Sequence, residues 1–318
     1  MAGYMLGQQL DFFEDTTVNE DKTDEIRVRL KEVIGDNPDF KIIERVPITK
    51  KGITLPYKLA EKVGDEETVV FLDTETTGLN QTNETIIELG LVKASFSPSK
   101  GRLTSIDAIF SEYEDPQKPI PPEVVKLTGI TDQDVKGQKI NRSKVKDLLD
   151  GTTLVIAHNA GFDRPFFEKR FTTFNDLRWA CSLKGIDWMD LGFPSHRQEE
   201  LLHAIGYFYD AHRASTDCLA LAWFMHKRPD SFRNLLENAE KKSVIVHAFG
   251  APFDAKDTLK ANGYRWDDGT SGNSKHWWRE VPESDLDNEK AFLDDLYSSG
   301  SDLASYSVKT AENRFRQE

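Results

Sequence analysis

The stretch that decides the fold is Val69-Val70-Phe71-Leu72-Asp73-Thr74-Glu75-Thr76-Thr77-Gly78-Leu79, which combines an apolar strand, two acidic residues and a turn. Its four consecutive apolar residues, two of them β-branched, predict a strand buried on both faces, as in a sheet covered by helices. Side chains alternate along a strand, so Asp73 and Glu75 are expected on one side of its C-terminal end. Two adjacent carboxylates repel unless a cation offsets them, and such oxygen ligands suit Mg²⁺ or Mn²⁺. The alternative is a solvated turn that binds nothing.

The length and composition are those of an ordinary globular protein. A chain of 318 residues with 38% hydrophobic content can bury one large core and a smaller domain. No apolar run approaches the ~20 residues that cross a membrane, and the N-terminus lacks a signal-peptide pattern. We therefore expect a soluble, cytoplasmic protein without a membrane partner. Cys181 and Cys218, the only cysteines, are too few for a disulfide scaffold and too isolated for a zinc site.

The net charge of −13 is unusual for a protein that binds phosphate chains, but the acidic residues are concentrated near the two ends. Residues 1–25 carry seven acidic residues against one lysine, and residues 283–295 carry six against one. The central part of the chain is therefore nearly neutral. Because bound metal ions would neutralise some of its acids, this part need not repel nucleic acid.

The first 25 residues are acidic, polar and without periodicity, which predicts a disordered tail. The tail nevertheless contains the apolar cluster Gln9-Leu10-Asp11-Phe12-Phe13. This pentapeptide resembles the sliding-clamp-binding motif of bacteria, although Phe12 stands where leucine is commoner. The resemblance implies that Gln9, Leu10, Phe12 and Phe13 bind a sliding clamp or a replicase. The alternative is a tail that docks on its own domain.

Proline, glycine and changes of composition divide the rest of the chain. We expect an N-terminal extension at 26–65 with no assignable function, a main domain at 66–228, a linker at 229–242, a small α+β domain at 243–297 and a flexible tail at 298–318. The main domain is predicted as α/β, with a mixed sheet and helices on both faces. Its further elements are strands at 85–96, 103–110 and 152–157 and a helix that begins at Pro121-Pro122 and ends at Gly129.

Another acidic residue follows the strand at 152–157, in the stretch His158-Asn159-Ala160-Gly161-Phe162-Asp163-Arg164-Pro165. Asn159 is a suitable N-cap, and proline is best tolerated in the first turn of a helix. We therefore expect Asp163 in that first turn, beside the edge of the sheet. The alternative role of Asp163 is to complement the helix dipole, which is worth only ~0.3–1 kcal/mol.

The last candidate pair is His212 and Asp217, at the start of an apolar helix that Ser215 or Thr216 is expected to cap. Residues five apart on one helix lie on different faces, so His212 is expected on the preceding loop, where it can approach the carboxylates. Taken alone, each of the two residues would more often be structural.

The acidic residues and the histidine together resemble the DnaQ-like 3′-to-5′ exonucleases of the Asp-Glu-Asp-Asp-His type. The resemblance covers residues 68–225 in the family's order, and both Asp-Thr-Glu-Thr-Thr-Gly-Leu and His-Asn-Ala-x-Phe-Asp match its motifs. It implies a ribonuclease H-like fold and hydrolysis of phosphodiester bonds with two Mg²⁺ or Mn²⁺ ions. Two ions about 3.5–4 Å apart can stabilise both the attacking and the leaving oxygen.

The resemblance also implies a role for each of the five catalytic residues. Asp73 bridges both ions, Glu75 and Asp217 complete the first site, and Asp163 holds the second ion through water. His212 is the implied general base, because the ordinary pKa of histidine is near neutral. Activity should then rise with pH through the neutral range.

Four further residues are implied to hold the 3′-terminal nucleotide. Thr76 and Thr77 offer hydrogen bonds from the main chain or the hydroxyls, Leu79 wedges against a base, and Asn159 assists near the scissile bond. Each of these residues also has an explanation as a turn or cap residue.

The C-terminal domain interleaves aromatic residues with Arg265, Lys275 and Arg279, which suits stacking on single-stranded bases, or the aromatic residues form its core. The implied function of the chain is a metal-dependent exonuclease that acts on single-stranded or 3′-ended DNA in proofreading or repair and releases nucleoside monophosphates. One alternative is the same chemistry on RNA or short oligonucleotides. The other is a nucleic-acid-binding protein without catalysis.

Overall fold

The computed structural model describes residues 20–35, 37–50, 52–270, 272 and 274–316, with side chains described from residue 25 onward. The chain divides into two units, Met1–Glu44 and Arg45–Glu318. In the first unit, helix α1 (Glu20–Ile34) carries Arg27 and Lys31, which form ion pairs with Glu44 (3.2 and 3.5 Å). This helix begins at Glu20, inside the expected disordered tail. The predicted clamp-binding residues Gln9, Leu10, Phe12 and Phe13 lie outside the described residues.

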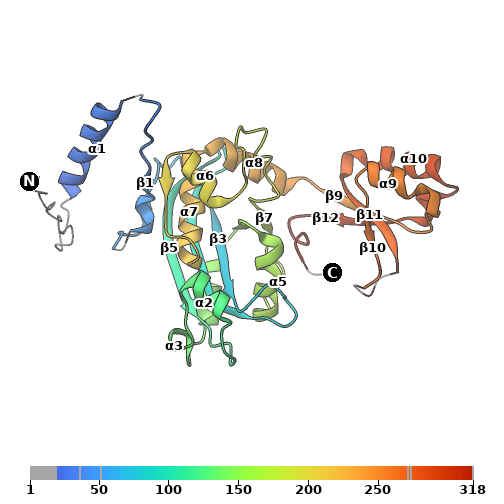
Figure 1. Cartoon of the computed structure of the whole chain (residues 1–318), viewed down its shortest axis with the longest axis horizontal. Coiled ribbons are helices and arrows are strands. Elements are labelled where there is room, and N and C mark those ends of the chain that lie inside the picture. The colour runs from blue at the N-terminus through green and yellow to red at the C-terminus, as the bar shows by residue number, and fades with distance from the viewer. Residues whose placement is uncertain (1–19, 36, 51, 271, 273, 317–318) are drawn as a thin grey trace, which may run out of the picture. The chain divides into compact units, whose positions relative to one another are not determined.

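The second unit is built on a six-stranded sheet with the order β2-β5-β4-β3-β6-β7. Figure 1 labels β5, β3 and β7 of this sheet. Its strands are β2 (Tyr57–Lys58), β3 (Glu67–Thr76), β4 (Ile86–Ser97), β5 (Arg102–Tyr113), β6 (Leu154–Ala157) and β7 (Trp179–Cys181). Strands β2, β5, β4 and β3 pair antiparallel, whereas β6 runs parallel to β3, and β7 parallel to β6. The sheet is mixed, and β3, which contains Asp73 and Glu75, lies near its centre.

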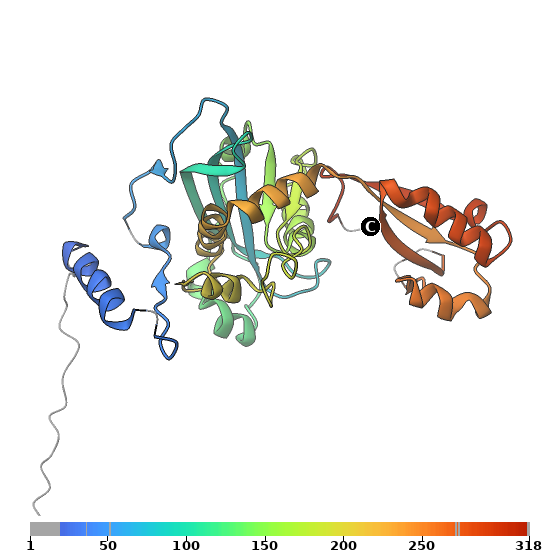
Figure 2. The same ribbon diagram turned by 90° about the horizontal axis from the view of Figure 1, so that it is seen from above.

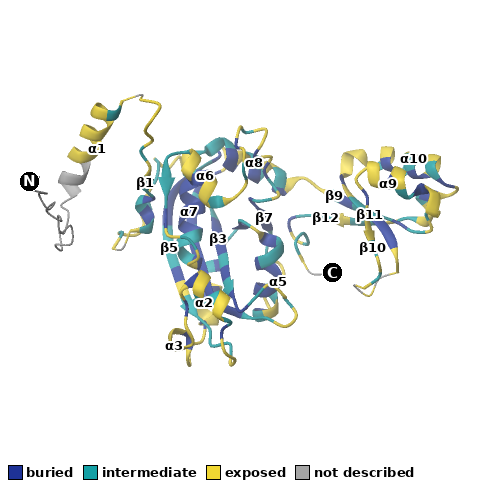
Figure 3. Ribbon diagram, viewed as in Figure 1, coloured by how far each residue is buried: buried dark blue, intermediate teal, exposed yellow. Residues whose placement is uncertain are grey.

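Helices cover both faces of this sheet (Figure 2). They are α2 (Pro122–Thr128), α3 (Asp132–Val135), α4 (Arg142–Leu149), α5 (Ala160–Arg170), α6 (Gln198–Ala204), α7 (Ala214–Lys227) and α8 (Pro229–Glu240). Val69 and Phe71 of β3 pack in a core with α6, α7 and α8, whereas Val70 and Leu72 pack in another core with α4 and α5. The buried residues of β3 and α7 are visible in Figure 3. The predicted α/β fold, a mixed sheet with helices on both faces, is confirmed. The alternation along β3 puts its odd-numbered residues on the α7 face.

Helix α7 lies very close to the sheet because β4 has a glycine at position 90. A Cβ atom on Gly90 would lie 2.3 Å from backbone atoms of Ala214 and Ser215, at the start of α7. The Cys218 thiol of the same helix donates to the Gly90 carbonyl (3.5 Å). A residue without a side chain at this place therefore lets the first turn of α7 approach the end of β3.

Two boundaries differ from those expected. Val46 and Ile48, which were expected in the N-terminal extension, are fully buried in the same core as α7. The boundary between the two units therefore falls after Glu44 and not near residue 65. The expected linker is mostly α8, whose Phe232 and Leu235 are buried in the same core because apolar residues three apart share one helix face. The shorter elements of this unit are β1 (Glu44–Arg45), the 3₁₀ helix η1 (Pro47–Thr49) and β8 (Tyr207–Phe208).

The C-terminal module is a second sheet, with all strands antiparallel in the order β10-β11-β9-β12. Its elements are β9 (Ser243–Ala248), η2 (Phe253–Ala255), α9 (Lys256–Ala261), β10 (Arg265–Asp267), β11 (His276–Pro282), η3 (Glu283–Asp285), α10 (Leu286–Leu296), α11 (Gly300–Leu303) and β12 (Ser305–Lys309). Val246 and Ala248 of β9 pack with Leu259 of α9 and Leu293 of α10, so the helices cover one face of the sheet. The predicted α+β character is confirmed.

Residues 298–316, expected as part of a flexible tail, belong to the fold. Strand β12 pairs with β9, and the main chain that follows it is bound by Arg164 of α5. The fully buried guanidinium donates to the carbonyls of Glu312 (2.6 Å) and Arg314 (2.7 Å) and to the carboxylate of Glu168 (2.8 Å). A buried guanidinium is costly unless its donors are satisfied, and these acceptors satisfy them.

Among the helices that the structure describes, none is both long and apolar enough to cross a membrane.

Candidate active site

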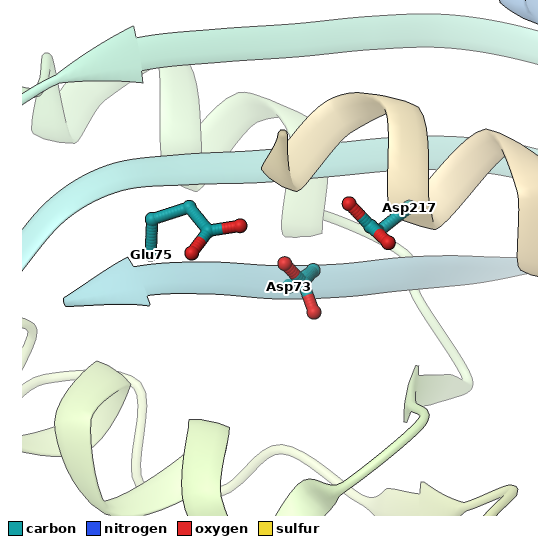
Figure 4. A group of neighbouring side chains, drawn as sticks. All are labelled: Asp73, Glu75 and Asp217. Atoms are coloured by element: carbon teal, nitrogen blue, oxygen red, sulfur yellow. The ribbon is translucent and has the colours of Figure 1, made fainter. Parts of the chain in front are cut away.

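Three carboxylates meet where the end of β3 faces the first turn of α7: Asp73, Glu75 and Asp217 (Figure 4). One oxygen of each lies within 4.8 Å of the other two. Asp73 and Glu75 are both odd-numbered residues of β3, so both point to the α7 face. Asp217 reaches them because α7 packs directly on Gly90. The proximity of Asp73 and Glu75 is the one predicted from the alternation of the strand.

Burial and mutual repulsion raise the pKa values of these carboxyl groups. Burial, with the charges of Asp163 and Asp217, raises the pKa of Asp73 well above its ordinary value. Burial and then the charge of Asp217 raise the pKa of Glu75 to about 8. Burial also raises the pKa of Asp217 to about 6, although hydrogen bonds to its carboxylate act in the opposite direction. A bound cation would offset this repulsion, because an opposite charge nearby favours the ionised form.

The carboxylate of Asp217 is held at both oxygens. The Tyr209 hydroxyl donates to Oδ1 (2.9 Å), and the Arg213 main-chain N–H donates to Oδ2 (2.9 Å). Gln198 Nε2 in turn donates to the Tyr209 hydroxyl (2.9 Å) and to the Asp217 carbonyl (3.0 Å). The sequence reasoning missed Tyr209 and Gln198, since neither belongs to a motif.

A fourth acid, Glu88 of β4, lies directly opposite Glu75 in the register and is fully buried. Arg213 donates to both of its oxygens (3.1 and 3.2 Å), and Ser111 Oγ donates to Oε1 (2.7 Å). The pair joins the start of α7 to β4. Glu88 was also missed, because one glutamate inside an apolar strand carries no signal of its own in the sequence.

Asp163 approaches the site from the other face of the sheet. It lies in the first turn of α5, as predicted, and is 2% exposed. Its Oδ1 accepts hydrogen bonds from the main-chain N–H (3.1 Å) and the hydroxyl (2.8 Å) of Thr74, an even-numbered residue of β3. Burial raises the pKa of Asp163 to about 7, and the bonds from Thr74 limit the rise. Asp163 therefore lies beside the group of three oxygens without joining it.

The start of α5 departs from expectation in two details. Asn159 is at the N-cap position and is exposed, but its side chain makes no capping hydrogen bond. Pro165 lies beyond the first turn, inside the helix. Its ring is buried among the apolar residues of α5, so packing retains it at a position that costs a helical hydrogen bond.

His212 lies on the loop before α7, as predicted, with its side chain exposed and its backbone in the left-handed region (φ 67°). Its charge is one of the smaller influences that lower the pKa of Asp217. The cap expected from Ser215 or Thr216 is absent from the described helix start, because both residues are inside α7 and the N-cap residue is Arg213.

The threonine hydroxyl groups in the turn after Glu75 form hydrogen bonds within the protein. Thr76 Oγ1 donates to the Gly78 carbonyl (2.7 Å), and Thr77 Oγ1 donates to Glu84 Oε2 (2.5 Å). Both threonines are buried, whereas the side chain of Leu79 is 85% exposed. A nucleotide that met this turn would therefore contact Leu79 before it met either hydroxyl.

The chain is similar to known exonuclease-containing proteins. Residues 70–224 match the family model described as Exonuclease (RNase_T). The DNA polymerase III PolC-type of Bacillus subtilis (strain 168) is 30% identical over 205 residues, which are 62% of this chain and 13% of that protein. The PolC-type polymerase of Halalkalibacterium halodurans is 37% identical over 210 residues, again 62% and 13%. The chain thus spans about an eighth of the length of these relatives.

A solved structure, the zinc-bound form of an E. coli exonuclease I complex with single-stranded DNA, aligns with 74% of this chain and 69% of its own. The TM-score is 0.45 and the sequence identity 18%. The family match covers all five predicted catalytic residues, from Asp73 to Asp217. Residues 70–224 are therefore similar to the exonuclease family, in agreement with the resemblance of the DnaQ-like motifs.

Proposed function

We propose that this protein is a 3′-to-5′ exonuclease that hydrolyses the phosphodiester bonds of DNA with divalent metal ions. The observation that carries the proposal is the group of three oxygens from Asp73, Glu75 and Asp217 within 4.8 Å, in a domain of the exonuclease family. DNA is favoured over RNA because the relatives are DNA polymerases by name. The proofreading or repair setting belongs to the same proposal.

The residues of the site fit hard divalent cations such as Mg²⁺ or Mn²⁺. Carboxylate oxygens are the ligands that these cations take, and burial followed by the charge of Asp217 raises the pKa of Glu75, so that a bound cation would be favourable there. Asp73, Glu75 and Asp217 would hold the ions, with Asp163 beside them. When bound, two ions supply stabilisation of the attacking and leaving oxygens.

The chain's own groups would orient the reaction. Tyr209 and the Arg213 N–H hold the carboxylate of Asp217 in one orientation. His212, exposed on its loop beside Asp217, would accept the proton of the attacking water. The exposed Leu79 would pack against the terminal base, Thr76 and Thr77 would shape the turn that holds it, and Asn159 would contact the strand near the scissile bond.

The test compares wild type with Asp73→Asn on single-stranded DNA, duplex DNA and RNA, each 5′-labelled, with Mg²⁺ or Mn²⁺. We expect a ladder that shortens from the 3′ end, and none with the variant or with EDTA. A circular single strand is the control for internal cleavage. Cleavage of the circle, faster cleavage of RNA, or unchanged activity of Asp73→Asn would each contradict the proposal.

A sliding-clamp partner and a cytoplasmic location complete the proposal. The support for the clamp is the motif Gln9-Leu10-Asp11-Phe12-Phe13, and the support for the location is the replicative character of the relatives. Clamp affinity, measured by surface plasmon resonance, should disappear in the double variant Leu10→Ala, Phe12→Ala. Retained affinity would remove the clamp from the proposal.

A further inference from the structure

A cleft of about 740 Å³ lies between the exonuclease domain and the C-terminal module, apart from the carboxylates. We call it the basic cleft. Its charged residues are the cations Lys184, Lys241, Lys242 and Arg314 and the acids Asp187 and Glu280. This excess of positive charge stands out in a chain with a net charge of −13. The volume is within the ~300–1,000 Å³ typical of ligand sites.

Two of these cations are available to a ligand. Lys184 and Lys242 are exposed, and within the described residues neither side chain forms an ion pair or donates a hydrogen bond. Arg314, by contrast, donates to the carbonyl of Asn238 (3.3 Å), and Lys241 donates to Asn238 Oδ1 (2.8 Å). Arg314 and Lys241 therefore build the wall of the cleft, whereas Lys184 and Lys242 carry its free charge.

One end of the basic cleft adjoins the motif that contains Asp163. The ammonium of Lys184 lies 3.8 Å from the position that a Cβ atom would take on Gly161, two residues before Asp163. The N–H of Leu183 donates to the carbonyl of His158 (3.0 Å), so this wall follows the start of α5. A strand that leaves the carboxylates past Asn159 would meet Lys184 first.

The other wall belongs to the sheet of the C-terminal module. Ser243, Glu280 and Pro282 line the basic cleft, and the register pairs Ser243 with Pro282. These residues share a face with Trp278, opposite to the face that the helices cover. On this face the guanidinium of Arg265 lies 5.4 Å from the ring centroid of the half-buried Trp278. Aromatic rings beside cations are the groups on which unpaired bases stack.

We infer that the basic cleft binds the single-stranded DNA that precedes the 3′ end, with Lys184 and Lys242 on its phosphates and the face with Trp278 toward its bases. The inference rests on the proposed function and specifies its substrate. A single strand is the occupant because stacking on Trp278 requires unpaired bases, while free lysines match the charge of a phosphate chain. The C-terminal module then acts as a substrate-binding part of the enzyme.

The test measures binding separately from cleavage. In the Asp73→Asn protein without metal, fluorescence anisotropy reports the affinity for an oligothymidine of ~16 nucleotides, the upper size of common single-strand sites. We expect Lys184→Glu with Lys242→Glu to weaken binding about 10-fold or more. Removal of two phosphate contacts should also lower the slope of log K against log salt by about 1.4. The control is Lys146→Glu, which reverses an exposed lysine of α4 that does not line the basic cleft.

A second measurement separates failure of the inference from failure of the proposed function. With Mg²⁺ and an intact Asp73, the double reversal should lower kcat/KM on the long oligonucleotide and leave that on a thymidine dinucleotide unchanged. Unchanged affinity and salt slope in a double variant that still cleaves the dinucleotide would overturn the inference that the basic cleft binds DNA. An equal loss of affinity in Lys146→Glu would overturn it as well. If wild type cleaves neither substrate, the proposed function fails while the binding comparison still decides the basic cleft. If the reversals impair folding, Lys184→Gln with Lys242→Gln should show the same loss of salt slope.

Discussion

Glu75 of β3 and Glu88 of β4 lie directly opposite each other, yet the groups that surround the two carboxylates differ. Glu88 is fully buried, and Arg213, Ser111 and the Ala214 N–H donate to its oxygens. Glu75 shares its side of the strand with Asp73, and burial with the charge of Asp217 raises its pKa to about 8. Like charges directly opposite each other destabilise a sheet unless they are compensated.

The different surroundings of Glu75 and Glu88 indicate that Glu88 has a structural role and Glu75 a role in the reaction. The charge of Glu88 is compensated by the chain itself, through an arginine 125 residues away in sequence. Bound cations, as proposed, would compensate the charges of Glu75 and its neighbours. The first arrangement should therefore control stability, and the second should control metal-dependent activity.

Asp73→Asn should abolish most of the activity, which is a greater change than we expect from the other substitutions. Cleavage should fall by more than about 1,000-fold, beyond the ~10- to 100-fold typical when a partner of a metal ligand is lost. The metal-free protein should at the same time become more stable, because a buried carboxyl group with repelling neighbours is gone. Both are measured on one preparation, by gel assay and by thermal unfolding in EDTA. The matched control is Asp107→Asn, whose carboxylate accepts bonds from Ser95 and Ser105 and should leave cleavage unchanged.

The next effect is on stability, in Arg213→Ala. Removal of the guanidinium leaves Glu88 buried and without its cation, which should cost about 2 kcal/mol of unfolding free energy. Urea denaturation measures this loss. Adding Glu88→Gln should restore much of the stability, since the uncompensated charge is then removed. A loss of stability that Glu88→Gln does not relieve would mean that the arginine acts through other contacts, such as the one to Tyr113.

The repelling carboxyls should also make the metal-free protein less stable as pH rises. Folded Asp163 and Glu75, with pKa values raised to about 7 and about 8, keep protons that the unfolded chain has released. The stability that these two protons contribute is therefore fully present below about pH 4 and is lost as pH rises toward 8. We expect the melting temperature in EDTA to fall by roughly 3 °C or more from pH 5 to pH 8. Glu75→Gln should show a shallower fall, and Mg²⁺ should raise the melting temperature more at pH 8 than at pH 6. A melting temperature in EDTA that does not change with pH would contradict the prediction that these carboxyl groups are uncompensated without metal.

The smallest effect is expected for Tyr209→Phe, which removes one hydrogen bond to Asp217. Tyr209 is a positioning residue, so the Mg²⁺ concentration for half-maximal activity should rise about 10-fold. Activity at saturating Mg²⁺ should recover most of the wild-type value. An unchanged metal requirement with a lower kcat would instead point to a direct effect on the reaction.

The local parts of the site could be predicted from the amino-acid sequence. The apolar run before Asp73 predicts the buried strand, and the alternation of side chains places Asp73 and Glu75 on one side. The motifs around Asp163 and His212 predict a helix start and a loop, both of which are observed. These features depend on residues close in sequence, which is why the pattern reveals them.

The contacts between parts that are distant in sequence could not be predicted and are seen in the folded protein. The bond from Thr74 to Asp163 joins residues 89 positions apart, and Arg164 binds the main chain of Arg314, 150 positions away. Tyr209 reaches Asp217 only because the two flank a helix start that packs on Gly90. No local period records such contacts, because they arise from how helices pack on the two faces of a sheet. The chain's motifs therefore predict which groups do the chemistry, and the packing decides which charges are left for a metal ion to compensate.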